Sequence, residues 1–171
     1  QQDVTEQKEK TRLLEVLFNG TFQFIGLLET DGTVVRVNDT ALEFGGFDRQ
    51  DIVGEPFYEA SWWTHSEEAK NRLREALDRG ADGEFVRYNT EVNGKDGFAM
   101  IDFSVKPVTD DCGDVVLLVV EGRDITDREE KRKRMGMVQR VMRHNIRNDL
   151  TKVRGWAQIM SEEPDADTRL D

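Results

Sequence analysis

The chain has 171 residues, of which 37% are hydrophobic and 35% are charged, and its formal net charge is −11. This composition can fill one hydrophobic core but excludes a membrane protein, because the aliphatic run 115–120 is far shorter than the roughly 20 apolar residues of a transmembrane helix. The acidic balance argues against non-specific nucleic-acid binding, and no basic-then-apolar signal segment opens the chain, so we expect a cytoplasmic location.

The charges are distributed unevenly. Residues 128–154 contain ten Lys or Arg and three Asp or Glu, so this segment is basic in an otherwise acidic chain. It is either a solvated helix face or a surface that meets an anionic partner. Arg outnumbers Lys 16 to 8, and together with the acidity this balance is similar to that of proteins from salt-loving archaea.

The first elements follow from periodicity and turn residues. Apolar residues at helical spacing predict a helix over residues 4–18, ended by Gly20. Residues 21–38 alternate around Asp31 and Gly32, which predicts a hairpin of two strands.

Three helices are expected next, at residues 39–44, 47–54 and 66–80. Asn38 or Asp39 caps the first of them, and a glycine ends each one.

The remaining elements before residue 127 are strands. Residues 83–92, 98–108 and 115–122 read as strands separated by the turns "NGKDG" and "TDDCGD". Tight turns make consecutive strands antiparallel. We therefore expect an α+β domain with a five-stranded antiparallel sheet and short helices on one face.

Two stretches carry a family resemblance. "DGTVVRVNDTALEFGGFDRQDIVGEPF" and "DDCGDVVLLVVEGRDITDREE", in this order of elements, resemble a PAS sensor domain over residues 20–127. The sequence Asp124-Ile125-Thr126 is similar to the junction at which such domains continue into a signalling helix. Residues 1–19 would then be an N-terminal helix or linker.

After residue 127 a single long helix is the economical interpretation. Apolar residues recur at steps of three and four, at Met135, Val138, Met142, Ile146, Leu150, Val153, Ala157 and Met160. A lone helix cannot bury this stripe, so we expect a parallel homodimer through the C-terminal helices. Residues 128–171 would hold the signalling helix and the first helix of a helical hairpin, with a turn beginning near residue 161.

His144 is the candidate reacting group on this helix. It lies roughly 160° around the axis from Ile146 and therefore faces solvent, away from the stripe. Its helical neighbours are Arg140, Arg147, Asn148 and Thr151. An exposed helix histidine usually has no task, but an imidazole flanked by guanidinium groups suits phosphoryl transfer, which depends on positioning and charge stabilisation.

The local sequence "RHNIRNDLTKVRGWAQ" resembles the phosphoacceptor box of sensor histidine kinases, most closely the haloarchaeal variety. The resemblance assigns phosphoacceptor function to His144 and gives Asn148 a part in dephosphorylating a partner response regulator. Asn145 departs from the family pattern, in which an acidic residue acts as base. Asp149 also departs, because proline is often found there and kinks the helix.

The resemblance implies a sensory and phosphoacceptor fragment of a two-component histidine kinase. No Gly-rich nucleotide loop follows in these residues, so ATP would be supplied through a domain outside them, and the fragment should be inactive alone. Its expected partners are a second copy and a response regulator receiver domain, with no nucleic acid and no membrane in this fragment. The alternative is a PAS ligand-binding or dimerisation module of a signalling or transcription regulator in which His144 is unused, and an enzyme proper comes third.

A PAS-type fold leaves a cavity between sheet and helices. The candidates to line it are Phe24, Phe44, Phe57, Trp62, Trp63, Leu77, Phe85, Tyr88, Phe103 and Leu118. These residues suit a small aromatic ligand, but aromatic residues also fill small cores without any ligand.

Other cofactors find little support in the sequence. A photoactive flavin site needs a helix cysteine, whereas Cys112 lies in a turn. A haem would need His65 as axial ligand, and that residue is more simply a polar group near a helix start. No metal site is expected.

Overall fold

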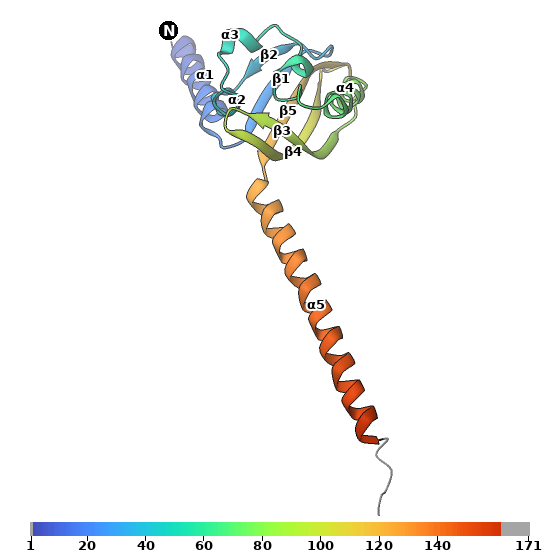
Figure 1. Cartoon of the computed structure of the whole chain (residues 1–171). Coiled ribbons are helices and arrows are strands. Elements are labelled where there is room, and N and C mark those ends of the chain that lie inside the picture. Colours follow the sequence, from blue (N-terminus) through green and yellow to red (C-terminus); the bar gives the residue numbers. More distant parts are fainter. Residues whose placement is uncertain (1, 162–171) are drawn as a thin grey trace, which may run out of the picture. The chain divides into compact units, whose positions relative to one another are not determined.

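The structure, a computed structural model, describes residues 2–161 (Figure 1). It divides the chain into two units, residues 1–126 and 127–171. The first unit holds all five strands and the shorter helices, and helix α5 (Thr126–Ser161), apart from its first residue, forms the described part of the second. The turn predicted from residue 161 onwards lies, apart from Ser161, outside the described residues.

The five strands form one sheet in the order β2-β1-β5-β4-β3, and every neighbouring pair is antiparallel. This confirms the predicted α+β fold with a five-stranded antiparallel sheet. The strands are β1 (Phe24–Leu28), β2 (Val34–Val37), β3 (Val86–Gly94), β4 (Gly97–Thr109) and β5 (Val115–Asp124).

Each strand has one face turned towards the core. In β4, Ile101, Phe103 and Val105 are buried and alternate with more exposed residues, and Leu118 and Val120 do the same in β5. Because successive side chains of a strand point to opposite faces, this alternation fixes the register against the helices.

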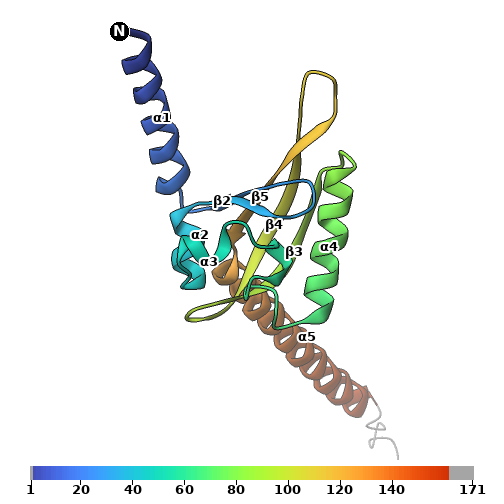
Figure 2. The ribbon, with the colours of Figure 1, turned by 90° about the horizontal axis from the view of Figure 1, so that it is seen from above.

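The helices of the first unit supply the other side of the core. They are α1 (Gln2–Gly20), α2 (Asp39–Gly45), α3 (Arg49–Ile52), the 3-10 turn η1 (Phe57–Glu59) and α4 (Glu67–Ala81). Buried residues of α2, α3 and α4 join the inward residues of the sheet in one cluster, and α4 runs alongside the part of the sheet formed by β3, β4 and β5 (Figure 2).

The predicted caps of α2 and α4 are present. The side chain of Ser66 accepts a hydrogen bond from Ala69 N at 3.2 Å and begins α4. Gly46, at φ 72°, ends α2 in the left-handed conformation that glycine adopts without strain. The helix predicted over residues 47–54 is shorter, because Val53 is already extended and Gly54 turns the chain at φ 88°.

Gly80 does not end α4, contrary to the prediction. The helix continues to Ala81, and Gly80 is buried against the sheet. A Cβ at this position would lie 2.7 Å from Val105 Cγ1 and 3.3 Å from Leu118 Cδ2. The glycine is therefore explained by close helix-to-sheet packing, which a local stop signal does not reveal.

Asn38 joins three elements through one buried side chain. Its Oδ1 accepts hydrogen bonds from Ile25 N at 3.0 Å and Ala41 N at 3.2 Å, which link β1 to the start of α2. Its Nδ2 donates to the carbonyls of Phe18 at 2.9 Å and Gln23 at 2.8 Å, which adds the end of α1. The side chain is thus a connector as well as the predicted cap.

Within residues 2–161, no helix combines the length and the apolar character needed to cross a bilayer.

Candidate functional site

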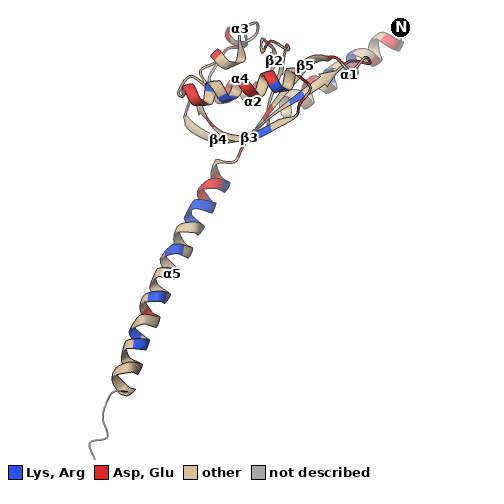
Figure 3. Cartoon of the chain, turned by 90° about the vertical axis from the view of Figure 1, so that its right-hand side faces the viewer, with Lys and Arg blue, Asp and Glu red and all other residues tan. Residues whose placement is uncertain are grey.

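Helix α5 carries His144 on an exposed surface. The described residues of α5 are exposed from Glu130 onwards, and Lys and Arg recur along the helix (Figure 3). The Nδ2 atom of Asn148 lies 3.3 Å from His144 Nδ1. The structure thus brings together His144 and Asn148, one helical turn apart.

The other predicted neighbours occupy the same helix. Thr151 Oγ1 donates a hydrogen bond to the carbonyl of Arg147 at 2.8 Å, so this hydroxyl is directed at the helix backbone. Asn145 lies one residue beyond His144, about 100° around the axis, where residues do not face each other. Asp149 is accommodated in an unbroken helix that extends to Ser161.

The apolar stripe of α5 is exposed over its described length. Met135, Ile146, Leu150 and Val153 have between 58% and 64% of their surface exposed. Single exposed apolar residues are ordinary on a protein surface, but a continuous stripe of them marks an interaction site.

Thr126, the first residue of α5, forms hydrogen bonds with two strands. Its Oγ1 donates to Asp124 Oδ1 at 2.6 Å and accepts a hydrogen bond from Met100 N at 3.0 Å. The backbone of Ile125 extends the contact by donating to the Met100 carbonyl at 2.8 Å. The end of β5 and the first residue of α5 are therefore fixed against β4.

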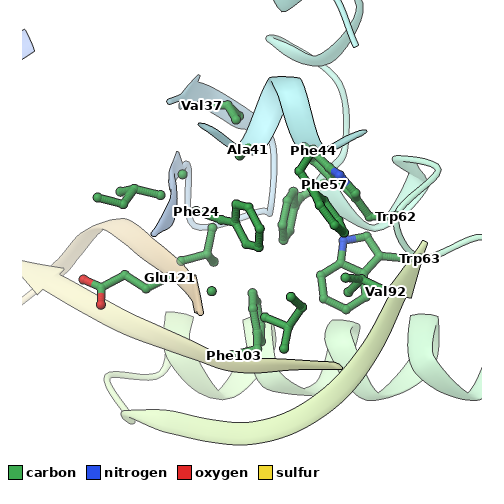
Figure 4. Close-up of a pocket in the computed structure, with 15 residues that line it drawn as sticks. Phe24, Val37, Ala41, Phe44, Phe57, Trp62, Trp63, Val92, Phe103 and Glu121 are labelled. Atoms are coloured by element: carbon green, nitrogen blue, oxygen red, sulfur yellow. The ribbon is translucent and has the colours of Figure 1, made fainter. Parts of the chain in front are cut away.

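A small apolar cavity lies between the sheet and the helices (Figure 4). Its volume is about 50 Å³. For comparison, an engineered cavity that binds benzene measures about 150 Å³. Six of the predicted residues line it, namely Phe24, Phe44, Phe57, Trp62, Trp63 and Phe103.

The remaining cavity candidates lie elsewhere. Leu118 is buried beneath α4, close to Gly80, and Tyr88 packs against Phe103 under the guanidinium of Arg72. Leu77 is buried on α4 itself. Phe85 is 56% exposed and lies just before β3, so its assignment to the cavity was wrong.

Sequence reasoning missed the glycines that line the cavity. Gly26 and Gly122 belong to the paired strands β1 and β5. A Cβ on Gly26 would lie 2.8 Å from Val120 Cγ2, and one on Gly122 would lie 2.9 Å from Ile101 Cγ2. A glycine inside a strand pattern is the signal that indicates such close approach.

Two buried polar atoms have no hydrogen-bond partner among the described residues: Trp63 Nε1 and Tyr88 Oη. Burial raises the pKa of Tyr88 to about 12, and the nearby Arg72 opposes this rise. The neutral phenol is therefore favoured in the folded protein.

Neither His65 nor Cys112 lines this cavity. His65 Nδ1 is 3.1 Å from the carbonyl of Trp62, and its ring contacts Phe98 edge-on. Cys112 is exposed in the turn between β4 and β5. Among residues 2–161, no three His, Cys, Asp or Glu side chains come together as a metal site.

Comparison with curated proteins finds sensor kinases. The chain is 38% identical over 151 residues to a hybrid signal transduction histidine kinase D of Dictyostelium discoideum, which covers 86% of the chain and 9% of that protein. It is 36% identical over 125 residues to the sensor histidine kinase TmoS of Ectopseudomonas mendocina, covering 71% of the chain and 13% of TmoS. The chain therefore spans about a tenth of the length of these relatives.

Among solved structures, the PAS domain of an HTR-like protein from Haloarcula marismortui superimposes with a TM-score of 0.59. The two chains are 18% identical, and the match covers 72% of this chain and 98% of the other. At this identity the likeness concerns the fold. Residues 18–130 match the family model described as the PAS fold, which is more than half of the chain, and the chain belongs to that family.

Proposed function

We propose that this chain is the sensory and phosphoacceptor portion of a two-component histidine kinase. In this proposal the PAS domain receives a signal, α5 transmits it, and His144 accepts a phosphoryl group from an ATP-binding domain. His144 then passes the group to the receiver domain of a response regulator. The observation that carries the proposal is the exposed His144, held by Asn148 on the helix that directly continues the last PAS strand.

The relatives support this assignment beyond the PAS domain. A match over 86% of the chain leaves about 24 residues outside it, and His144 lies 27 residues before the last one. Wherever the matched span begins, it therefore extends past the PAS domain and reaches His144.

The surroundings of His144 suit an incoming phosphate. Arg140 and Arg147 lie within one helical turn of it, and the described part of α5 has more basic than acidic residues. Guanidinium groups stabilise phosphoryl oxygens through charge-assisted hydrogen bonds. The imidazole supplies the nucleophile, and the arginines supply the charge stabilisation.

The cavity supports a relay more than a site for a ring-sized ligand. Its 50 Å³ is about a third of the benzene-binding volume quoted above, and aromatic rings of the core fill the adjacent space. A small aromatic ligand would have to displace one of these rings. In the proposed function, movement of the sheet itself is sufficient to carry a signal to Thr126.

The helices would act as a pair. The exposed stripe on α5 is buried when two copies associate in parallel, which would leave both His144 side chains on the outside of the pair. An outward position would give the nucleotide-binding domain and the receiver domain access to each histidine.

The decisive experiment uses the parent protein with its nucleotide-binding domain. It is incubated with labelled ATP, and wild type is compared with His144→Gln and with His65→Gln as the matched control. We expect label that is stable in base and lost in acid, retained in His65→Gln and absent from His144→Gln. Undiminished labelling of His144→Gln would overturn the phosphoacceptor role and favour a PAS module that only binds or dimerises.

A further inference from the structure

The apolar stripe of α5 does not follow one uninterrupted heptad repeat. Its eight residues, from Met135 to Met160, are separated by steps of three, four, four, four, three, four and three. A parallel coiled coil alternates steps of three and four, which are the distances between its core positions a and d. The three consecutive steps of four run from Val138 to Leu150, and His144 lies in the middle of them.

The steps define two heptad frames that are out of step by one residue. The first frame places Met135 and Met142 at position a and Val138 at position d. The second frame begins with Ile146 at position d and continues through Leu150, Val153, Ala157 and Met160. All of these side chains are exposed on the single helix. Two separate seams are therefore available to a partner, one on each side of His144.

Neither frame can run the whole length of the helix. Continuing the first frame towards the C-terminus would put Asn145, Asp149 and Lys152 into the seam. Extending the second frame towards the N-terminus would put Arg143 and Gln139 into it. A charged side chain between two helices loses its hydration, and no partner in the seam compensates for this loss. Each frame is therefore restricted to its own half of the stripe.

The charges beside the second frame fit a second copy of the same helix. Asp149 occupies position g and Arg154 occupies position e of the next heptad, and these two positions face each other across a parallel dimer. Among the described residues of α5, ion pairs form only near its start, at Glu129 and Glu130, so Asp149 and Arg154 form none within their own helix. In a parallel dimer Asp149 of one copy would pair with Arg154 of the other, on each side of the seam.

We propose that α5 pairs in parallel with α5 of a second copy through both frames, and that the frame changes at His144. At about 100° per residue, His144 then points directly away from the midpoint between Met142 and Ile146. In either frame alone it would be turned by about 50° to one side. The change of frame therefore holds His144 outward, with Arg140 and Arg147 within about 60° of it around the helix.

This inference rests on the proposed pairing of the helices and specifies which residues meet. It does not depend on phosphorylation of His144. Since additional steps of four locally unwind a coiled coil, the two helices would also lose their supercoil around this residue.

Disulfide cross-linking in the full 171-residue chain tests the seam. Cys112, which is exposed, is first replaced by serine. Single cysteines are then placed at two pairs of adjacent positions, Met142→Cys with Arg143→Cys and Ile146→Cys with Asn145→Cys. Two cysteines can bridge only where their Cα atoms come within about 7 Å, so Met142→Cys and Ile146→Cys should form disulfide dimers about tenfold faster than their neighbours.

The pattern of cross-links distinguishes the possible seams. Fast cross-linking of Met142→Cys and Asn145→Cys would indicate an unbroken first frame, and fast cross-linking of Arg143→Cys and Ile146→Cys an unbroken second frame. Either result, or equal rates at all four positions, would overturn the inference while the pairing itself stands. A Cys112→Ser chain that sediments as a monomer, with no fast cross-link at any of these positions, would overturn the pairing as well. The phosphoacceptor role of His144 would still be decided separately, by labelling with ATP.

An exchange of charges tests the ion pair. Asp149→Lys or Arg154→Glu alone should weaken the dimer about fivefold at low ionic strength, because two exposed ion pairs per dimer become repulsive contacts. The double variant should regain the wild-type dissociation constant in sedimentation equilibrium. Arg140→Glu, on the outward face, changes the charge by the same amount as Arg154→Glu and should have no comparable effect. A double variant that dimerises as weakly as the single variants would overturn the proposed second frame.

Discussion

The hydroxyl of Thr126 accepts a hydrogen bond from the backbone N–H of Met100, at 3.0 Å. Met100 belongs to β4 and Thr126 begins α5, so this contact fixes the end of the sheet to the start of the helix. The carboxylate of Asp124 accepts hydrogen bonds from both the hydroxyl and the backbone N–H of Thr126. The junction is therefore held by side-chain chemistry as well as by the chain itself.

Replacing Thr126 by Val removes the hydroxyl while keeping a branched side chain. We expect the free energy of unfolding to fall by about 1 kcal/mol, because the Met100 N–H loses its partner at a half-buried site. Urea denaturation followed by tryptophan fluorescence measures the change. Thr109→Val, on the exposed end of β4, is the control and should have no comparable effect.

Replacing Asn38 by Ala removes four hydrogen bonds from a fully buried position. A loss of about 3 kcal/mol in unfolding free energy is expected. Asn38→Ser should recover part of the loss by capping α2, but it cannot reach the carbonyls of Phe18 and Gln23. Equal stability of wild type and Asn38→Ala in thermal denaturation would show that water replaces these bonds without penalty.

Tyr88→Phe should stabilise the domain. The wild-type hydroxyl is buried with no partner among the described residues, so its removal is expected to raise the unfolding free energy by about 1 kcal/mol at neutral pH. The measurement is again urea denaturation, and Tyr58→Phe, a half-buried tyrosine that packs against the core, is the control.

Tyr88→Phe should also change how the unfolding free energy depends on pH in alkaline solution. Folding raises the pKa of Tyr88 from 10.0 to about 12. The unfolding free energy of wild type is therefore unaffected by this group below pH 10 and falls as the pH rises towards 12, because the unfolded chain ionises first. Tyr88→Phe lacks this loss. The difference in unfolding free energy between the variant and wild type should therefore widen between these two pH values, and a constant difference would contradict the assigned pKa.

Phe24→Ala should enlarge the cavity enough to admit a ring. Phe24 lines the cavity and packs against Phe44, with ring centroids 4.8 Å apart and the ring planes tilted by 36°. Truncation should destabilise the domain by about 3 kcal/mol and allow benzene to raise the melting temperature of the variant. Wild type should show no such rise. A benzene-dependent rise in wild type would mean that the native cavity already opens to a ring.

Leu150→Glu should dissociate the expected dimer. Leu150 is 61% exposed on the apolar stripe, and a carboxylate there would be buried between helices. Sedimentation of the full chain in high salt should show a dimer for wild type and a monomer for this variant. Thr151→Glu adds the same charge on the face of His144 and should remain dimeric. A monomeric wild type at tens of micromolar would contradict the proposed pairing.

The order and type of the main elements could be predicted because their signals are local. Ser66 begins α4 as a cap, and alternation along β4 and β5 marks the face that packs on the core. Gly80 was misassigned because a glycine that ends a helix and a glycine that allows close packing look alike in sequence. Only the distance to Val105 separates the two.

The candidate site also has one part that the sequence predicts and one that it does not. The approach of Asn148 to His144 follows from helical spacing alone, since residues four apart are neighbours. The cavity depends on long-range packing, which the sequence does not specify residue by residue. Tyr88 and Leu118 point inward as expected but lie beneath α4, and Phe85 precedes its strand and points outward.

The order of strands has a mechanical consequence. β1, the first strand, pairs with β5, the last strand. A single row of backbone hydrogen bonds therefore joins the strand that begins the sheet in sequence to the strand that leads into α5. Asn38 fastens the end of α1 to β1, and Thr126 fastens the start of α5 to the sheet. The path from the N-terminal helix to the start of the C-terminal helix therefore crosses only the β1–β5 pair and does not depend on a ligand in the core. A change that makes this strand pair more rigid should reduce movement at both ends of the domain.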